Sequence, residues 1–78
     1  MRVYVLFYKG GEPCDVFASL ADAMLNAEAN AGVDPNEDAQ WMHGMDEAAK
    51  NHTWVLRDAS GDERFGQVIE EMTVKARE

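Results

Sequence analysis

The sequence predicts an α+β fold in which two β-hairpins of an antiparallel sheet flank a helical middle segment, in the order ββααββ. β-Branched and aromatic residues gather near both ends of the chain, and an alanine-rich run with helix-capping residues lies between them. Glycine, proline and aspartate separate these segments, as expected at turns. A chain of 78 residues is expected to form a single domain over residues 1–78, with one small core.

The first hairpin is predicted at the N-terminus. Residues 2–8 (RVYVLFY) are apolar on both alternating faces, which is typical of a central strand covered on two sides. The KGGEP segment then turns the chain, because its glycines permit positive φ and its proline cannot donate to a ladder. The residues CDVFA return as the second strand, in which Cys14 is expected to be a half-buried structural residue rather than a nucleophile.

A helix is predicted from Leu20 to about Ala31. Ser19 precedes the alanine-rich run and Asp22 follows three positions later, a pattern that resembles a capping box. Gly32 ends the helix at the position where a left-handed residue is favoured. The apolar face of this helix would comprise Leu20, Ala23, Met24, Ala27 and Ala31.

A second helix, interrupted or loosened at Gly44, is predicted over residues 34–47 (DPNEDAQWMHGMDE). Asp34 suits its N-cap and Pro35 suits its first helical position. Trp41 and Met45 are four positions apart and would share the apolar side. The acids turned mostly towards solvent would be Glu37, Asp38 and Glu47.

The second hairpin is predicted in the last third of the chain. Residues 53–58 (TWVLRD) form its first strand, and ASGDE forms a turn. Residues 64–74 (RFGQVIEEMTV) alternate in a strand-like way, although their apolar positions also suit a helix, and we favour the strand. Gly66 would mark a bulge in it.

The net charge of −8 is unevenly distributed along the chain. Residues 10–49 hold nine acids and no lysine or arginine, whereas the other 38 residues hold six acids and all seven bases. An acidic chain lacks the basic footprint that nucleic acids and anionic membranes require, so we expect neither as a direct partner. The unbalanced acids predict a basic protein partner, while a surface that serves only solubility is the alternative.

The predicted contact set lies in the acidic middle segment. Its carboxylates would pair with basic side chains of the partner, much as phosphates do in a DNA-binding groove. Trp41 or Met42 would add an apolar anchor, because adjacent residues on a helix point about 100° apart and one of the two must face outward. The predicted partner-binding residues are Asp34, Glu37, Asp38, Trp41, Met42, Asp46 and Glu47.

The two histidines suggest an alternative to the partner-binding surface, which is a metal site. His43 lies three and four positions before Asp46 and Glu47, and His52 follows nine positions after His43. The chain has no HExxH or paired CxxC motif, so we predict a solvated helical face, with no metal, no cofactor and no enzymatic activity. The single cysteine and the absence of a signal-peptide pattern predict a soluble protein in a reducing cytoplasm.

Two segments resemble parts of known small proteins. Residues 2–24 (RVYVLFY…DVFASLADAM) resemble the opening of orphan proteins encoded by phages and mobile elements, and FGQVIEEMTV is similar to their closing strand. The whole chain is similar in size and acidity to small anti-CRISPR proteins. This resemblance implies a non-enzymatic inhibitor that blocks a DNA-binding surface of a bacterial defence complex, such as a CRISPR effector. A homodimeric structural or regulatory protein is the alternative.

Overall fold

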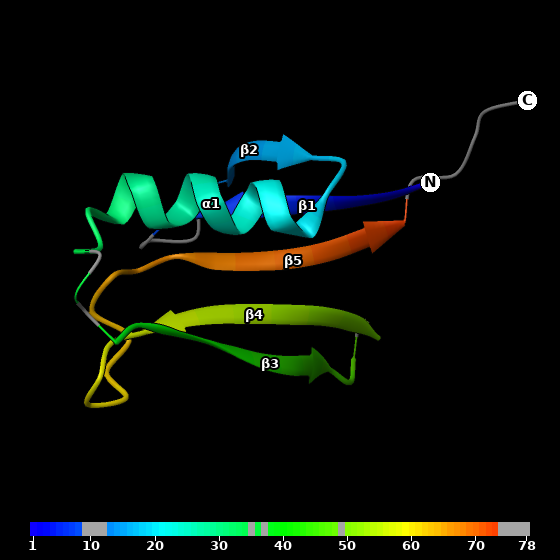
Figure 1. Cartoon of the computed structure of the whole chain (residues 1–78). Coiled ribbons are helices and arrows are strands. Elements are labelled where there is room, and N and C mark those ends of the chain that lie inside the picture. Colours follow the sequence, from blue (N-terminus) through cyan, green and yellow to red (C-terminus); the bar gives the residue numbers. More distant parts are fainter. Residues whose placement is uncertain (9–12, 35, 37, 49, 74–78) are drawn as a thin grey trace, which may run out of the picture.

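The computed structural model describes residues 1–8, 13–34, 36, 38–48 and 50–73, which form five strands and one helix (Figure 1). In chain order these elements are β1 (Arg2–Phe7), β2 (Pro13–Phe17), α1 (Leu20–Ala31), β3 (Gln40–Asp46), β4 (Asn51–Arg57) and β5 (Val68–Thr73). No helix within these described ranges is long and apolar enough to cross a membrane.

The strands form one sheet in the order β2-β1-β5-β4-β3, and every neighbouring pair is antiparallel. The α+β class and the antiparallel sheet are confirmed, but the predicted order ββααββ is wrong, because the observed order is ββαβββ with one helix. The first hairpin pairs Val5 with Val16, as predicted for β1 and β2. Most of its predicted turn, KGGEP, lies outside the described residues.

Helix α1 begins and ends where its capping residues predict. Ser19 has an extended backbone, and its hydroxyl accepts a hydrogen bond from the backbone N–H of Asp22 at 3.4 Å. Gly32 is left-handed with φ of 68°, and the N–H groups of Gly32 and Val33 donate to the last carbonyls of the helix. These contacts satisfy backbone groups that the helix itself leaves unpaired.

The core lies between α1 and the sheet. Ala23 and Ala27 of α1 are fully buried against Leu6 of β1 and Ile69 of β5. Alanine has the smallest apolar side chain, so the helix approaches the strands closely. Larger, partly buried side chains pack around this cluster: Tyr4, Phe17, Leu20, Met24, Trp41 and Trp54.

The second predicted helix is the main error, because most of that segment forms strand β3. Trp41 and Met45 are four positions apart, and this spacing puts two side chains on one side of a helix and also on one face of a strand. The pairing partner decides between the two, since residues Gln40 to Asp46 pair in register with Arg57 to Asn51 of β4. Gly44 does not decide between the two, because an interior glycine weakens a helix and a strand by a similar amount, about 0.5–1 kcal/mol relative to alanine.

The end of the chain follows the prediction more closely. β4 contains most of the predicted 53–58 strand, and β5 confirms a strand within 64–74. Gly66 has φ of 67°, but it lies before β5 and its N–H donates to the carbonyl of Glu63 at 3.1 Å. It therefore belongs to a turn and does not mark a bulge.

The two faces of the sheet differ. α1 lies over the β1 and β2 side of one face, which we call the helix face (Figure 1). On the other face, Phe7, Val68, Val55 and Met42 are paired neighbours in one apolar row across four strands. No described helix or strand packs over this second face. We call this surface the open face; its apolar residues also include Val3, Val5, Val16 and Met72. β1 is a central strand, as predicted, and its adjacent residues Val5 and Leu6, which point to opposite faces, are both buried.

Candidate functional site

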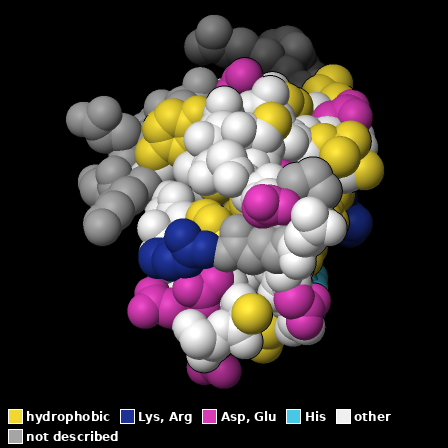
Figure 2. Space-filling view, turned by 60° about the vertical axis from the view of Figure 1, so that its left-hand side comes forward, with side chains coloured by type: hydrophobic (Ala, Val, Ile, Leu, Met, Phe, Trp, Pro, Cys, Tyr) yellow, Lys and Arg dark blue, Asp and Glu magenta, His cyan; other side chains and the backbone are white. Residues whose placement is uncertain are grey.

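Acidic residues from two separate segments meet at one end of the sheet. Because β3 and β4 are antiparallel and Gln40 pairs with Arg57, the start of β3 and the end of β4 lie together. The segment before β3 and the loop after β4 both reach this end (Figure 1). Figure 2 shows Asp and Glu side chains spread over it, with a smaller group of basic atoms. We define the acidic end as Asp34, Asp38, Asp58, Asp62 and Glu63.

Asp58 organises the loop after β4. Its Oδ1 atom accepts hydrogen bonds from the Ser60 hydroxyl at 2.7 Å, the Asp62 N–H at 2.9 Å and the Ser60 N–H at 3.0 Å. Its Oδ2 atom accepts from Arg64 Nε at 2.8 Å. Hydrogen bonds to the carboxylate lower the pKa of Asp58 from 3.8 to about 2. The Ser60 hydroxyl contributes most, and the Asp62 N–H and Arg64 contribute less. Asp58 therefore stays ionised at neutral pH, but its oxygens are engaged within the loop.

Asp34, Asp38, Asp62 and Glu63 are the exposed acids of this end. Asp34 accepts a hydrogen bond from the Asn36 N–H at 2.8 Å, which fixes the chain direction after α1. Their charges face solvent, and two arginines, Arg57 and Arg64, offset only part of the total. The acidic end therefore remains negative.

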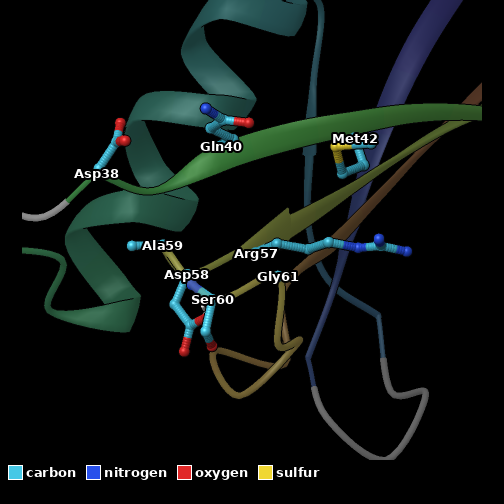
Figure 3. Close-up of a pocket in the computed structure, with 8 residues that line it drawn as sticks. All are labelled: Asp38, Gln40, Met42, Arg57, Asp58, Ala59, Ser60 and Gly61. Carbon is cyan, nitrogen blue, oxygen red and sulfur yellow. Dashed lines mark hydrogen bonds between the residues drawn. The ribbon is translucent and has the colours of Figure 1, made fainter.

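A shallow groove of about 330 Å³ lies beside these acids. Figure 3 shows Asp38 and Gln40 on one side of the groove and the Asp58 loop on the other, with Met42 and Arg57 further along it. Met42 is 44% exposed and offers an apolar surface to a partner side chain. The Arg57 Nε atom is buried and has no hydrogen-bond partner in the described part of the chain. The groove thus combines an apolar contact with both kinds of charge.

The predicted contact set is divided by the fold. Asp38 lies just before the start of β3 and Asp34 lies in the connection from α1, whereas Asp46 and Glu47 lie at the far end of β3, which is about 20 Å long at about 3.4 Å per strand residue. Glu37 lies outside the described residues, as do the side chains of Asp46 and Cys14. A single small contact cannot include both groups of acids.

Trp41 and Met42 point to opposite faces of β3. Trp41 packs against the core on the helix face, and its Nε1 donates to Glu28 Oε1 at 3.4 Å. Met42 lies on the open face and lines the groove. Of the two anchors considered from the sequence, Met42 is the accessible one.

Strand β3 is also an edge of the sheet, because β4 is its only neighbour in the strand order. Its seven residues include neither lysine nor proline, two residues that commonly protect edge strands from pairing. Its outer backbone groups are therefore suited to pairing with an extended segment of another protein.

Sequence reasoning missed the contribution of Asp62 and Glu63, because they belong to the half of the sequence whose charges are balanced. The turn signal ASGDE was visible, but only the β3–β4 pairing brings that turn beside Asp38. Among the described residues, no group of three or more His, Cys, Asp or Glu side chains is arranged to hold a metal ion.

Comparison of the chain with models of known protein families gave no match, and neither curated protein sequences nor solved structures gave one.

Proposed function

We propose that this protein is a small, acidic, non-enzymatic binding protein whose partner presents a basic, nucleic-acid-binding surface. The observation that carries the proposal is the meeting of acids from two segments beside a groove with an exposed methionine. Lysine and arginine side chains that hold DNA phosphates would pair with Asp34, Asp38 and Asp62 instead. Met42 would add an apolar contact at the centre of the surface.

The specific form of this proposal is a phage-encoded inhibitor of the anti-CRISPR type that acts in the cytoplasm of the host. Such a protein would occupy the DNA channel of a CRISPR effector and prevent DNA from binding. Its net charge of −8 would accelerate association with a basic channel, and added salt would slow it.

The experiment has two stages. The tagged protein is first used to capture partners from a bacterium with active defence systems, and a basic nucleic-acid-binding complex is expected. The purified complex is then loaded with labelled duplex DNA, and displacement of the DNA is measured as the protein is added. If the captured partners bind no nucleic acid, or if the protein fails to displace the DNA, the proposal is wrong.

Two triple variants with the same change in charge test the surface. Replacing Asp34, Asp38 and Asp62 by asparagine should weaken binding by roughly 100-fold, if each lost charge pair contributes about 1 kcal/mol. The control variant replaces Asp15 and Asp22 by asparagine and Glu47 by glutamine, at exposed positions outside the acidic end. The affinity of this control variant for the partner should be within a few-fold of that of the parent. Equal binding by both folded variants would show that the acidic end serves only solubility.

The open face supports a second candidate, a homodimeric structural or regulatory protein. This face has an apolar row across four strands, and Val16 at its margin is 57% exposed. Its charged side chains among the described residues, Arg57 and Glu70, have opposite signs. Two copies could therefore pack through it with less acid–acid repulsion than elsewhere on the chain, and we take a second copy as the occupant.

A further inference from the structure

The two histidines of the chain meet on the helix face of the sheet, His43 in the middle of β3 and His52 near the start of β4. His43 pairs directly with Trp54, and His52 pairs with Met45, so the histidines are diagonal neighbours across the two strands. The distance between His43 Nε2 and His52 Nδ1 is 2.8 Å. This pair lies on the face of β3 opposite to the groove-lining Met42, and the proposed function does not use it.

The two imidazole rings meet edge to edge. The ring centroids are 5.0 Å apart and the ring planes differ by 24°. The distance between the two facing nitrogens is only 2.8 Å, so these nitrogens lie between the two ring centres. One nitrogen donates the shared proton and the other offers its lone pair, whichever tautomer is present. A metal ion that replaces this proton would receive a lone pair from each ring.

From this geometry we infer that His43 and His52 form a binding site for Cu²⁺. Metal–imidazole bonds are about 2.0 Å long, so two nitrogens at 90° around a metal are about 2.8 Å apart, and at a tetrahedral angle about 3.3 Å apart. The observed distance fits the square arrangement preferred by Cu²⁺. Rotation of the two rings would direct both lone pairs to one metal ion without a change in backbone register.

The surroundings hold the rings and leave them accessible. The His43 ring lies parallel to the Trp54 ring, with centroids 5.1 Å apart and planes differing by 15°. Trp54 in turn packs against the core and contacts Tyr4 edge to face at 6.0 Å. His43 is exposed, since α1 lies over the β1 and β2 side of the sheet and leaves this part of the face uncovered (Figure 1). Binding would therefore require rotation of the two rings but no change in strand pairing.

Met45 is placed to add a third donor. It pairs directly with His52, shares the helix face with His43 and is 54% exposed. Its thioether is a soft ligand that copper accepts, and water would fill the remaining positions. The negative charge of the chain also favours a cation. Copper should therefore bind more tightly than nickel or zinc, following the usual order for divalent ions.

The test is a titration of the protein with Cu²⁺ alone, in a Cys14→Ser background that removes the thiol. One ion per chain is expected, with electron paramagnetic resonance showing two imidazole nitrogens. Saturating copper should also raise the melting temperature, because it binds the folded pair. Binding without two nitrogen ligands, or without an increase in melting temperature, would overturn the inference.

A composition-matched variant provides the control. Exchanging two neighbours, with Met42→His and His43→Met, keeps both histidines but moves one to the open face of β3. Copper affinity should fall by about tenfold or more, and His52→Gln should show a similar loss. If the exchanged protein does not fold, the single variants His43→Gln and His52→Gln provide the comparison. Unchanged copper affinity in any folded variant that lacks the pair would refute the site.

Discussion

Replacing Trp41 by alanine should destabilise the protein strongly, whereas replacing its neighbour Met42 should not. Trp41 is half-buried against the core and Met42 is 44% exposed on the other face. A tryptophan side chain buries about 150–250 Å² at about 25 cal/mol per Å², so partial burial of Trp41 contributes about 2–4 kcal/mol. A domain of 78 residues has a total stability of only about 4–12 kcal/mol. Met42→Ala should cost less than about 1 kcal/mol.

The two variants are compared by urea unfolding and by thermal melting, both followed by circular dichroism because Trp41→Ala removes a fluorophore. The melting temperature of Trp41→Ala should fall by roughly 10–30 °C, at about 4–8 °C per kcal/mol for a domain of this size. The melting temperature of Trp41→Phe should lie between those of the parent and the alanine variant, since phenylalanine keeps an aromatic ring but loses the Nε1 donor to Glu28. A melting temperature of Trp41→Ala close to that of the parent would show that Trp41 is not part of the core. A loss in Met42→Ala equal to that in Trp41→Ala would mean that the assignment of the two faces is wrong.

Two further predictions concern acid stability and assembly. The pKa of Asp58 is lowered to about 2 in the folded chain, so its carboxylate stabilises the fold above its ordinary pKa of 3.8, and this contribution is lost as the pH falls towards 2. The melting temperatures of the parent and Asp58→Asn should therefore differ near neutral pH and converge in acid; a constant difference would contradict the role of this carboxylate. If the open face joins two copies, sedimentation at micromolar concentration should show a dimer that Val55→Lys converts to a folded monomer. A parent that sediments as a strict monomer would rule out the homodimer.

The first hairpin and the helix could be predicted because their signals are local. Strand β1 is marked by its own β-branched and aromatic residues, and α1 is bounded by Ser19 and Gly32. Each of these signals acts within a few residues of the element it defines, so a single sequence is sufficient to read it.

Strand β3 could not be identified in this way, because its apolar spacing fits both helix and strand. Its structure is decided by β4, which pairs in register with all seven residues. The histidine pair was missed for the same reason. His43 and His52 are nine positions apart, and only the register of the hairpin brings them together across the two strands.

The distribution of charge along the sequence also failed to predict its distribution in space. The acid-rich residues 10–49 lie between two balanced segments of the chain, but strand pairing joins the two parts: β3 of the acid-rich part pairs with β4 of the balanced part, and β2 of the acid-rich part pairs with β1. Asp62 therefore belongs to the same surface as Asp38, while Glu47 of the acid-rich half lies at the other end of β3. The number of charges along the sequence shows that the protein is acidic. The positions of the acids on the surface depend on which strands pair.

The alternation of side chains along β3 keeps the proposed activities separate. Trp41, His43 and Met45 point to the helix face, whereas Met42 points to the open face beside the groove. A substitution at Met42 should therefore affect partner binding without affecting copper, and a substitution at His43 should do the reverse. This separation depends on the register of β3 on β4, because a slip of one residue would move Trp41 out of the core and exchange the two faces. Partial burial of Trp41 thus favours the register that keeps the histidine pair on one face and Met42 on the other, and both proposals depend on that register.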